Sequence, residues 1–249
     1  MKIFAINLLL AISLVTAGCA TGPNSYDPLE PMNRKIYGFN ESLDKAILKP
    51  VAKAYDYFVP SLIRTGVSNV FTNLGVLNTA VNDALQLKMR NVPIDLARFT
   101  TNVILGVGGL FDVATDIGIP YHQEDFGQTL GHWGVGSGPY LVLPLLGPST
   151  VRDGLGKPVD YILDPSSYID NEPIRWTVTG LKIISKRASL LAAETMLNDS
   201  AIDKYSFVRD SWLQRREYQI RDDSNRAGGM QSRYKGKSLR ELEMEESLN

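Results

Sequence analysis

The sequence predicts an all-α fold, and three observations support this prediction. Apolar residues recur at helical spacing in several long stretches, for example at Leu43, Ile47 and Val51. Pro93 and Gly106 stand where one such stretch would begin and end as a helix. The chain contains no alternating apolar and polar pattern long enough for a substantial sheet. The 249 residues, 44% of them hydrophobic, suffice for a folded core.

The N-terminus has the pattern of a secretory signal peptide over residues 1–18. Lys2 supplies a positive charge, an apolar run covers residues 3–15, and Thr16-Ala17-Gly18 precede Cys19. The run is too short to span a membrane, since that needs roughly 20 apolar residues to cross about 30 Å. The end of this segment resembles the lipobox of bacterial lipoproteins, with Thr16 where Leu is more usual. We therefore expect Cys19 to carry the lipid; the alternative is an ordinary signal that happens to end near a cysteine.

Composition divides the rest of the chain into three parts. Residues 19–26 are small and polar and read as a tether, residues 27–221 as a helical domain, and residues 222–249 as a disordered polar tail. As an alternative to complete disorder, the tail could contain a short acidic helix over 239–248. The net charge is −1, or −2 once Lys2 is removed, so no nucleic-acid partner is expected. Cys19 is the only cysteine, so no intrachain disulfide can form.

The first helical pattern begins near Met32, and a longer one over residues 40–58 contains Pro50, which should kink or divide it. Lysines at 45, 49 and 53 form a stripe, read either as a solvated face or as a surface that meets lipid phosphates. Further helices are predicted over 61–90 and from Pro93 to Leu105, the latter ending at Gly106.

Two helices are expected to close the domain. The first covers 173–197, where apolar residues form one face at helical period. The second begins near Ser200, whose side chain could cap the first turn, with Asp203 favoured there by the helix dipole. Tyr205, Val208 and Trp212 then form its buried stripe.

Residues 127–150 form an unusual segment without any Asp, Glu, Lys or Arg, and nine of its 24 residues are Gly or Pro. So many helix breakers cannot form a simple membrane-spanning helix. At membrane depth, irregular backbone is tolerated only where protein or a water-filled cavity satisfies its polar groups. The segment predicts a hairpin or re-entrant loop over 139–147; the alternative is a buried loop in a soluble core.

Candidates for catalysis and metal binding are weak. His122 and His132 belong to no metal-binding motif, so neither a metal nor another cofactor is expected. Ser137 could form a triad with His132 and either Asp125 or Asp153, but Gly136-Ser137-Gly138 is not the G-x-S-x-G motif of a nucleophilic serine. The sequence therefore gives no positive case for an enzyme.

Two stretches carry a family resemblance. DPLEPMNRKIYGFN (27–40) and EDFGQTLGHWGVGSGPYLVLPLLGPSTVRD (124–153) are similar to signature segments of the MlaA, or VacJ, family of outer-membrane lipoproteins. The likeness covers roughly 27–219. It implies a ring of amphipathic helices in the inner leaflet of the outer membrane, with a Gly/Pro-rich hairpin loop and an amphipathic central channel.

The resemblance also implies a function and partners. Proteins of this family remove mislocalised phospholipid from the outer leaflet, pass it to a periplasmic carrier of the MlaC type and associate with trimeric porins. It makes Arg175 and Lys182 candidate headgroup contacts, and Phe39, Gly136 and Gly138 candidate gate or hinge residues. The alternative function is a structural lipoprotein that scaffolds porins without moving lipid.

Overall fold

The computed structural model describes residues 27–194 and 203–234, which form long helices and one small hairpin. The predicted mostly helical fold is confirmed. The elements are α2 (Glu30–Leu43), the π-helical turn η1 (Asp44–Leu48), α3 (Lys49–Phe58), α4 (Ser61–Leu85), α5 (Asn91–Ile104), α6 (Val113–Asp116), α7 (Phe126–His132), β1 (Tyr140–Leu143), β2 (Gly147–Thr150), α8 (Val151–Leu163), the 3₁₀ turn η2 (Pro165–Tyr168), α9 (Glu172–Ser189) and α11 (Lys204–Tyr234).

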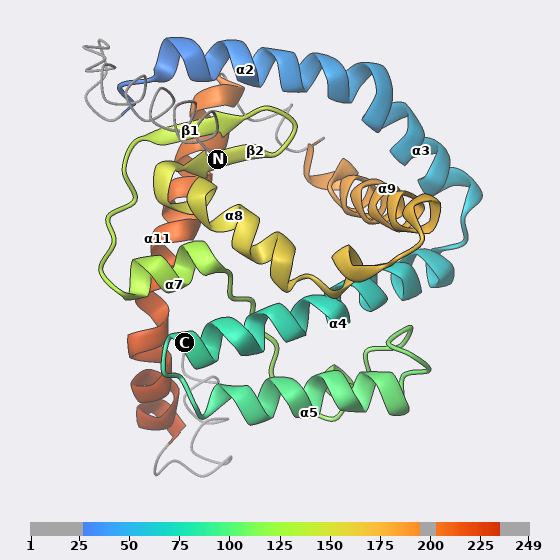
Figure 1. Cartoon of the computed structure of the whole chain (residues 1–249), viewed down its shortest axis with the longest axis vertical. Helices are drawn as coiled ribbons and strands as arrows, with labels where there is room; N and C mark the ends of the chain where they lie inside the picture. The colour runs from blue at the N-terminus through green and yellow to red at the C-terminus, as the bar shows by residue number, and fades with distance from the viewer. Residues whose placement is uncertain (1–26, 195–202, 235–249) are drawn as a thin grey trace, which may run out of the picture.

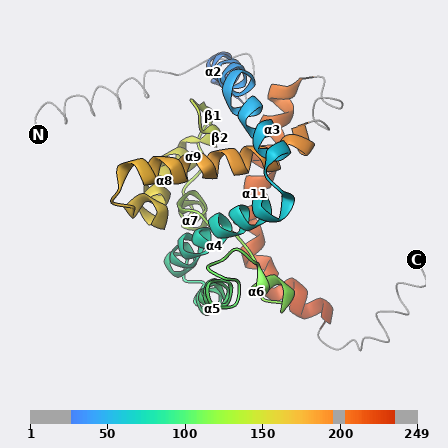
Figure 2. The same cartoon turned by 90° about the vertical axis from the view of Figure 1, so that its right-hand side faces the viewer.

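The helices are arranged as a ring-like bundle. α2, α3, α4 and α11 outline a frame, and α7, α8, α9 and the hairpin lie within that outline (Figure 1). α5 packs along α4 outside the frame, and Figure 2 shows the two helices side by side from the second direction. α9 packs on α3, and α7 packs on both α8 and α11. Within the described ranges, we find no helix that combines the length and apolar character needed to cross a membrane.

Pro50 divides the helical stretch predicted over residues 40–58, as expected. The chain bends between α2 and α3 (Figure 1), and the π-helical turn η1 lies at the bend. Pro50 stands in the first turn of α3 and has no N–H to donate to the preceding turn. Just before it, the Lys49 N–H bonds to the Asp44 carbonyl, five residues back instead of four. The wider turn accommodates the proline without ending the helical path.

The turn after α5 requires glycine. α5 ends at Ile104, one residue before the expected end, and a Cβ on Gly106 would lie 2.1 Å from the Phe111 carbonyl oxygen. Gly108 and Gly109 follow with φ of +71° and +90°, a region that glycine enters cheaply. The expected role of Gly106 in ending this helix is confirmed. α4, in contrast, ends at Leu85 and not at residue 90.

The segment expected to form a hairpin does so. β1 and β2 pair antiparallel, with Tyr140 opposite Thr150 and Leu143 opposite Gly147. Two asparagines of α2 bind the outer edge of β1. Asn33 donates to the Tyr140 carbonyl (3.0 Å) and accepts from the Val142 N–H (2.9 Å). Asn40 does the same with Leu143 and Leu145, both at 2.9 Å, so the hairpin is tied to α2 along its length.

The last two helices depart from the expected boundaries. α9 ends at Ser189 and not at Leu197, and the expected cap Ser200 lies outside the described residues. Asp203 accepts a hydrogen bond from the Tyr205 N–H (3.1 Å) at the start of α11. α11 continues to Tyr234, beyond the expected domain end at 221. Two further regions lie outside the described residues. They are residues 1–26, which include Cys19, and residues 235–249, where the sequence suggests a short acidic helix.

Candidate functional site

The described residues place many polar side chains inside the protein and many large apolar side chains outside. Asn82, Asp83 and Thr129 are fully buried, whereas Phe58 and Trp176 are 77% and 69% exposed. Burying such an apolar side chain normally contributes about 1.5–3 kcal/mol, so leaving many of them in water forgoes a large stabilisation. Exposed apolar side chains occur on every long helix of the frame and on α5. A surface of this extent indicates contact with an apolar medium or partner.

Hydrogen bonds satisfy much of the polar interior. Thr129 Oγ1 donates to Asn82 Oδ1 (2.7 Å), and Gln86 Nε2 donates to Thr129 Oγ1 (3.1 Å) and to Glu124 (2.9 Å). The Arg216 guanidinium binds Asp125 (2.6 Å) and Asp153 (3.0 Å). Buried polar groups are costly only when unpaired, so these networks allow an interior with few apolar residues.

A cavity of about 490 Å³ opens within the frame. Residues of α4, the segment before α7, α8 and α9 surround it, so its wall combines polar and apolar side chains. Its lining includes Phe71, Leu74, Asn78, Tyr121, Gln123, Asp160, Asp164, Lys182, Ser185, Lys186 and Ser189. A cavity of this size and mixed character can hold a polar headgroup.

Lys186 is the charged group of this cavity that is best placed to bind an anion. Lys182 forms an ion pair with Asp164, but no described residue forms an ion pair with Lys186. The pKa of Lys186 is lowered, first by burial and then by the positive charges of Lys157, Lys182 and Arg215. An anion beside Lys186 would relieve that repulsion and gain a charge-assisted hydrogen bond. The cavity is therefore suited to a phosphate-bearing ligand.

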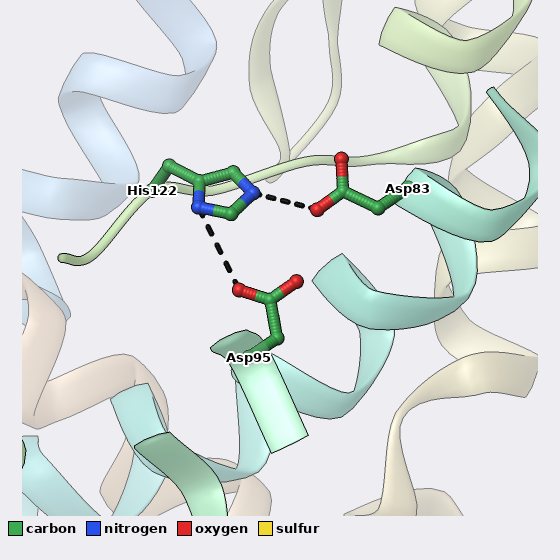
Figure 3. Close-up of side chains that lie close together, drawn as sticks. All are labelled: Asp83, Asp95 and His122. Atoms are coloured by element: carbon green, nitrogen blue, oxygen red, sulfur yellow. Dashed lines mark hydrogen bonds and ion pairs between the residues drawn. The ribbon is translucent and has the colours of Figure 1, made fainter. Parts of the chain in front are cut away.

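A second cluster lies where α4, α5 and the segment before α7 meet. His122 Nε2 lies 2.6 Å from Asp83 Oδ2, and His122 Nδ1 lies 3.6 Å from Asp95 Oδ1 (Figure 3). Burial and the Asp83 carboxyl raise the pKa of Asp95 to about 7. Burial opposes ionisation of Asp83, but its hydrogen bonds, above all with His122, lower its pKa overall. The same bond to Asp83 raises the pKa of His122.

Comparison with known proteins decides the family. A family model described as MlaA lipoprotein matches residues 25–219. The chain belongs to the MlaA lipoprotein family. It is 36% identical over 228 residues to the intermembrane phospholipid transport system lipoprotein MlaA of Escherichia coli (strain K12), covering 88% of this chain and 89% of that protein. An uncharacterized protein of Rickettsia bellii (strain RML369-C) is 36% identical over 202 residues, 80% of this chain and 79% of that protein.

A solved structure supports the same assignment. This structure is entitled "Structural basis for maintenance of bacterial outer membrane lipid asymmetry", and it superposes on this chain with a TM-score of 0.66. The two are 38% identical, and the match covers 78% of this chain and 98% of that chain. The ring-like helical bundle is thus the MlaA fold.

The two candidate headgroup residues of this MlaA-family chain lie in different places. Lys182 lines the cavity, as Lys186 does. Arg175 does not line it; its guanidinium donates to the Ile169 carbonyl (3.2 Å) and lies 3.6 Å from Glu172. Sequence analysis missed Lys186, although its i+4 spacing from Lys182 placed both lysines on one face of a helix.

The candidate gate residues of the MlaA-family chain flank the hairpin. Phe39 lies on α2 and is 55% exposed, next to Asn40, which holds β1. Gly136 and Gly138 precede β1, and Gly138 has a φ of +65°. A Cβ on Gly136 would meet nothing within 4 Å, whereas a Cβ on Gly138 would lie 3.1 Å from Val151 Cβ. The segment around these glycines is held by α8, since the Arg152 N–H donates to the Ser137 carbonyl (3.1 Å) and the Val151 N–H to the Pro139 carbonyl (3.2 Å).

The residues of the hypothetical triad are not assembled for catalysis. Asp125 and Asp153 both bind Arg216, while His132 is exposed on α7. Burial opposes ionisation of both carboxyls, but the Arg216 guanidinium lowers the pKa of each below its usual range. Both aspartates therefore stabilise the interior as the anionic partners of one arginine.

Proposed function

We propose that this chain transports phospholipid between membranes without catalysing a reaction. It removes mislocalised phospholipid from the outer leaflet of the outer membrane through an amphipathic channel and passes it to a periplasmic carrier of the MlaC type, which maintains lipid asymmetry. Moving a lipid breaks no covalent bond, so this function needs a route for the lipid through the protein and does not need catalytic residues.

One observation carries this proposal: the protein exposes many large apolar side chains, buries polar ones, and has a cavity lined by Lys186. The outer surface suits the acyl chains of one leaflet, and the cavity suits a headgroup that must be shielded from those chains. The ammonium group of Lys186 contacts the lipid phosphate, and Lys182, held by Asp164, adds positive potential beside it.

The location follows from the same reading. Cys19 carries acyl chains that anchor the protein in the inner leaflet of the outer membrane, with its polar side toward the periplasm and trimeric porins beside the ring. Several acyl chains anchor far more firmly than one, and the exposed apolar helix surfaces add to that anchoring. Phe39, Gly136 and Gly138 form the gate, with backbone movement in the segment before β1.

The test replaces Lys186 by Met, which keeps an apolar stem and removes the charge. A charge-assisted hydrogen bond is worth about 1.5–3 kcal/mol, so we expect the affinity for headgroups to fall by roughly tenfold or more. Outer-leaflet phospholipid, measured in a deletion strain complemented with the variant at matched abundance, should then rise toward the level of the deletion. Lys35→Met, an exposed lysine on α2, is the matched control and should restore wild-type asymmetry.

The alternative is a structural lipoprotein that scaffolds porins and moves no lipid. Lys186 lines the cavity in which the proposed transport binds the headgroup, and scaffolding does not need that cavity, so the same variant separates the two functions. If Lys186→Met still copurifies with porin and outer-leaflet phospholipid accumulates, transport is supported. If it also clears phospholipid at the wild-type rate, the cavity is not the lipid path.

A further inference from the structure

We propose that Asp83, Asp95 and His122 form a binding site for a divalent transition-metal ion, with Zn²⁺ the best chemical match. This inference does not depend on the transport function. The three residues come from the end of α4, the first turns of α5 and the segment before α7, so they do not form a contiguous sequence motif. One ligand atom from each residue lies within 4.8 Å of the other two (Figure 3).

The hydrogen bond to Asp83 orients the imidazole ring. At 2.6 Å, His122 Nε2 donates its proton to Asp83 Oδ2. In a neutral imidazole this leaves a lone pair on Nδ1, and Figure 3 shows Nδ1 facing Asp95. A carboxylate that fixes the tautomer of a metal-binding histidine in this way is a common outer-shell partner in protein metal sites.

The spacing on the other side of the ring fits a metal better than a shared proton. Nδ1 and Asp95 Oδ1 are 3.6 Å apart, too far for a hydrogen bond. Two tetrahedral ligands, each about 2.0–2.1 Å from zinc, would lie about 3.4 Å apart. Two acceptors therefore face each other across a gap of the width that one cation fills.

Asp95 supplies an independent observation. Its side chain is only 2% exposed, yet within the described part of the chain no N–H or hydroxyl group donates to Oδ2, and the group beside this carboxyl is another carboxyl, that of Asp83. Its carboxylate is turned into the cluster (Figure 3). A buried carboxylate oxygen without a partner is costly, and coordination to a metal would satisfy it.

Neighbouring cations do not fill this role. Arg98 donates to the Asp112 carboxylate at 2.6 and 2.7 Å, and Lys88 lies 3.1 Å from Glu124. The cluster thus offers the metal one imidazole nitrogen and the Asp95 carboxylate, with the Asp83 carboxylate as the outer-shell partner of the imidazole, and nitrogen and oxygen ligands of this kind suit Zn²⁺. The His122 side chain is 18% exposed, which leaves a route from solvent. Tyr121 and Gln123, on either side of His122, line the central cavity, so a bound metal would fix part of its wall.

The experiment uses the full mature chain in detergent, stripped with a chelator and then titrated with Zn²⁺. We expect one Zn²⁺ per chain, and affinity at least tenfold lower in His122→Gln and in Asp95→Asn. His132→Gln is the matched control, because this histidine is exposed on α7, and it should bind Zn²⁺ as the wild type does. Wild-type binding of less than one equivalent at micromolar Zn²⁺, or equal affinity in His122→Gln and wild type, would overturn the proposal.

A second readout does not require the variants to fold. Co²⁺ bound in place of Zn²⁺ should give the intense visible absorption of a four- or five-coordinate ion in the wild-type protein. The weak spectrum of hydrated Co²⁺ would mean that a proton, and not a metal, bridges the cluster, and would refute the site.

Discussion

At the scale of single residues, Arg216 shows how charge replaces apolar packing in this interior. One guanidinium from α11 holds Asp125 at the start of α7 and Asp153 in the first turn of α8, and both Arg216 and Asp153 are buried. Bringing three ions out of water is expensive, and their attraction repays that cost only while all three remain. The cluster thus makes the junction of α7, α8 and α11 sensitive to the loss of any member.

We expect Arg216→Met to lower the free energy of unfolding by about 3–5 kcal/mol, because it removes the buried cation that the buried Asp153 and the half-buried Asp125 share. Urea unfolding in detergent measures the effect. Arg221→Met is the control, since Arg221 is largely exposed and forms an ion pair with the exposed Glu217 one turn away; its effect should stay within about 0.5 kcal/mol. A similar decrease in the free energy of unfolding in the two variants would show that the Arg216 cluster contributes no more to stability than an exposed ion pair.

At the scale of elements, an ion network fixes the end of α9 against η1 and α3. Arg187 binds Asp44 at 2.6 and 2.7 Å, and Glu194 accepts from Arg187 (2.5 Å) and from Lys49 (2.6 Å). Burial opposes ionisation of Glu194, but these two cations outweigh it and lower its pKa to about 2. Lys49, part of the lysine stripe seen in the sequence, thus holds two elements together.

This network predicts a specific pH dependence. Because the folded state lowers the pKa of Glu194 from 4.5 to about 2, its stabilisation is present above pH 4.5 and disappears as the pH falls toward 2. Near neutral pH, we expect the free energy of unfolding of the wild type to exceed that of Glu194→Gln by on the order of 1 kcal/mol. This difference should vanish near pH 2. Urea unfolding across this range measures it, with the exposed Glu172→Gln as control. A difference independent of pH would contradict the assignment.

Local signals predicted elements well and long-range contacts poorly. Pro50, Gly106 and the breaker-rich hairpin act through their own backbone, so the sequence alone indicated their effects. The end of α9 at Ser189 carries no such signal, because the next eight residues include neither Gly nor Pro. The two site features that were missed depend on packing between elements: the cavity around Lys186, and the meeting of Asp83, Asp95 and His122.

At the scale of the whole molecule, the outward apolar side chains change what the folded state needs from its surroundings. A water-soluble domain gains most of its stability by removing apolar surface from water as it folds. Here much of that surface is still exposed after folding, as Phe58 and Trp176 illustrate, and in the proposed membrane location lipid removes it from water. The bilayer therefore acts thermodynamically as a ligand of the folded state.

Ligand linkage gives this consequence a measurable form. Once the folded state is more than half bound, each tenfold increase in accessible lipid should add about 1.4 kcal/mol to the free energy of unfolding. The urea midpoint of the mature chain, measured against graded phospholipid vesicles, should rise accordingly, and Phe58→Asp should need more lipid for the same rise. A midpoint independent of lipid would contradict the linkage. The same relation makes the chain least stable in water, and makes its stability depend on the lipid available to it.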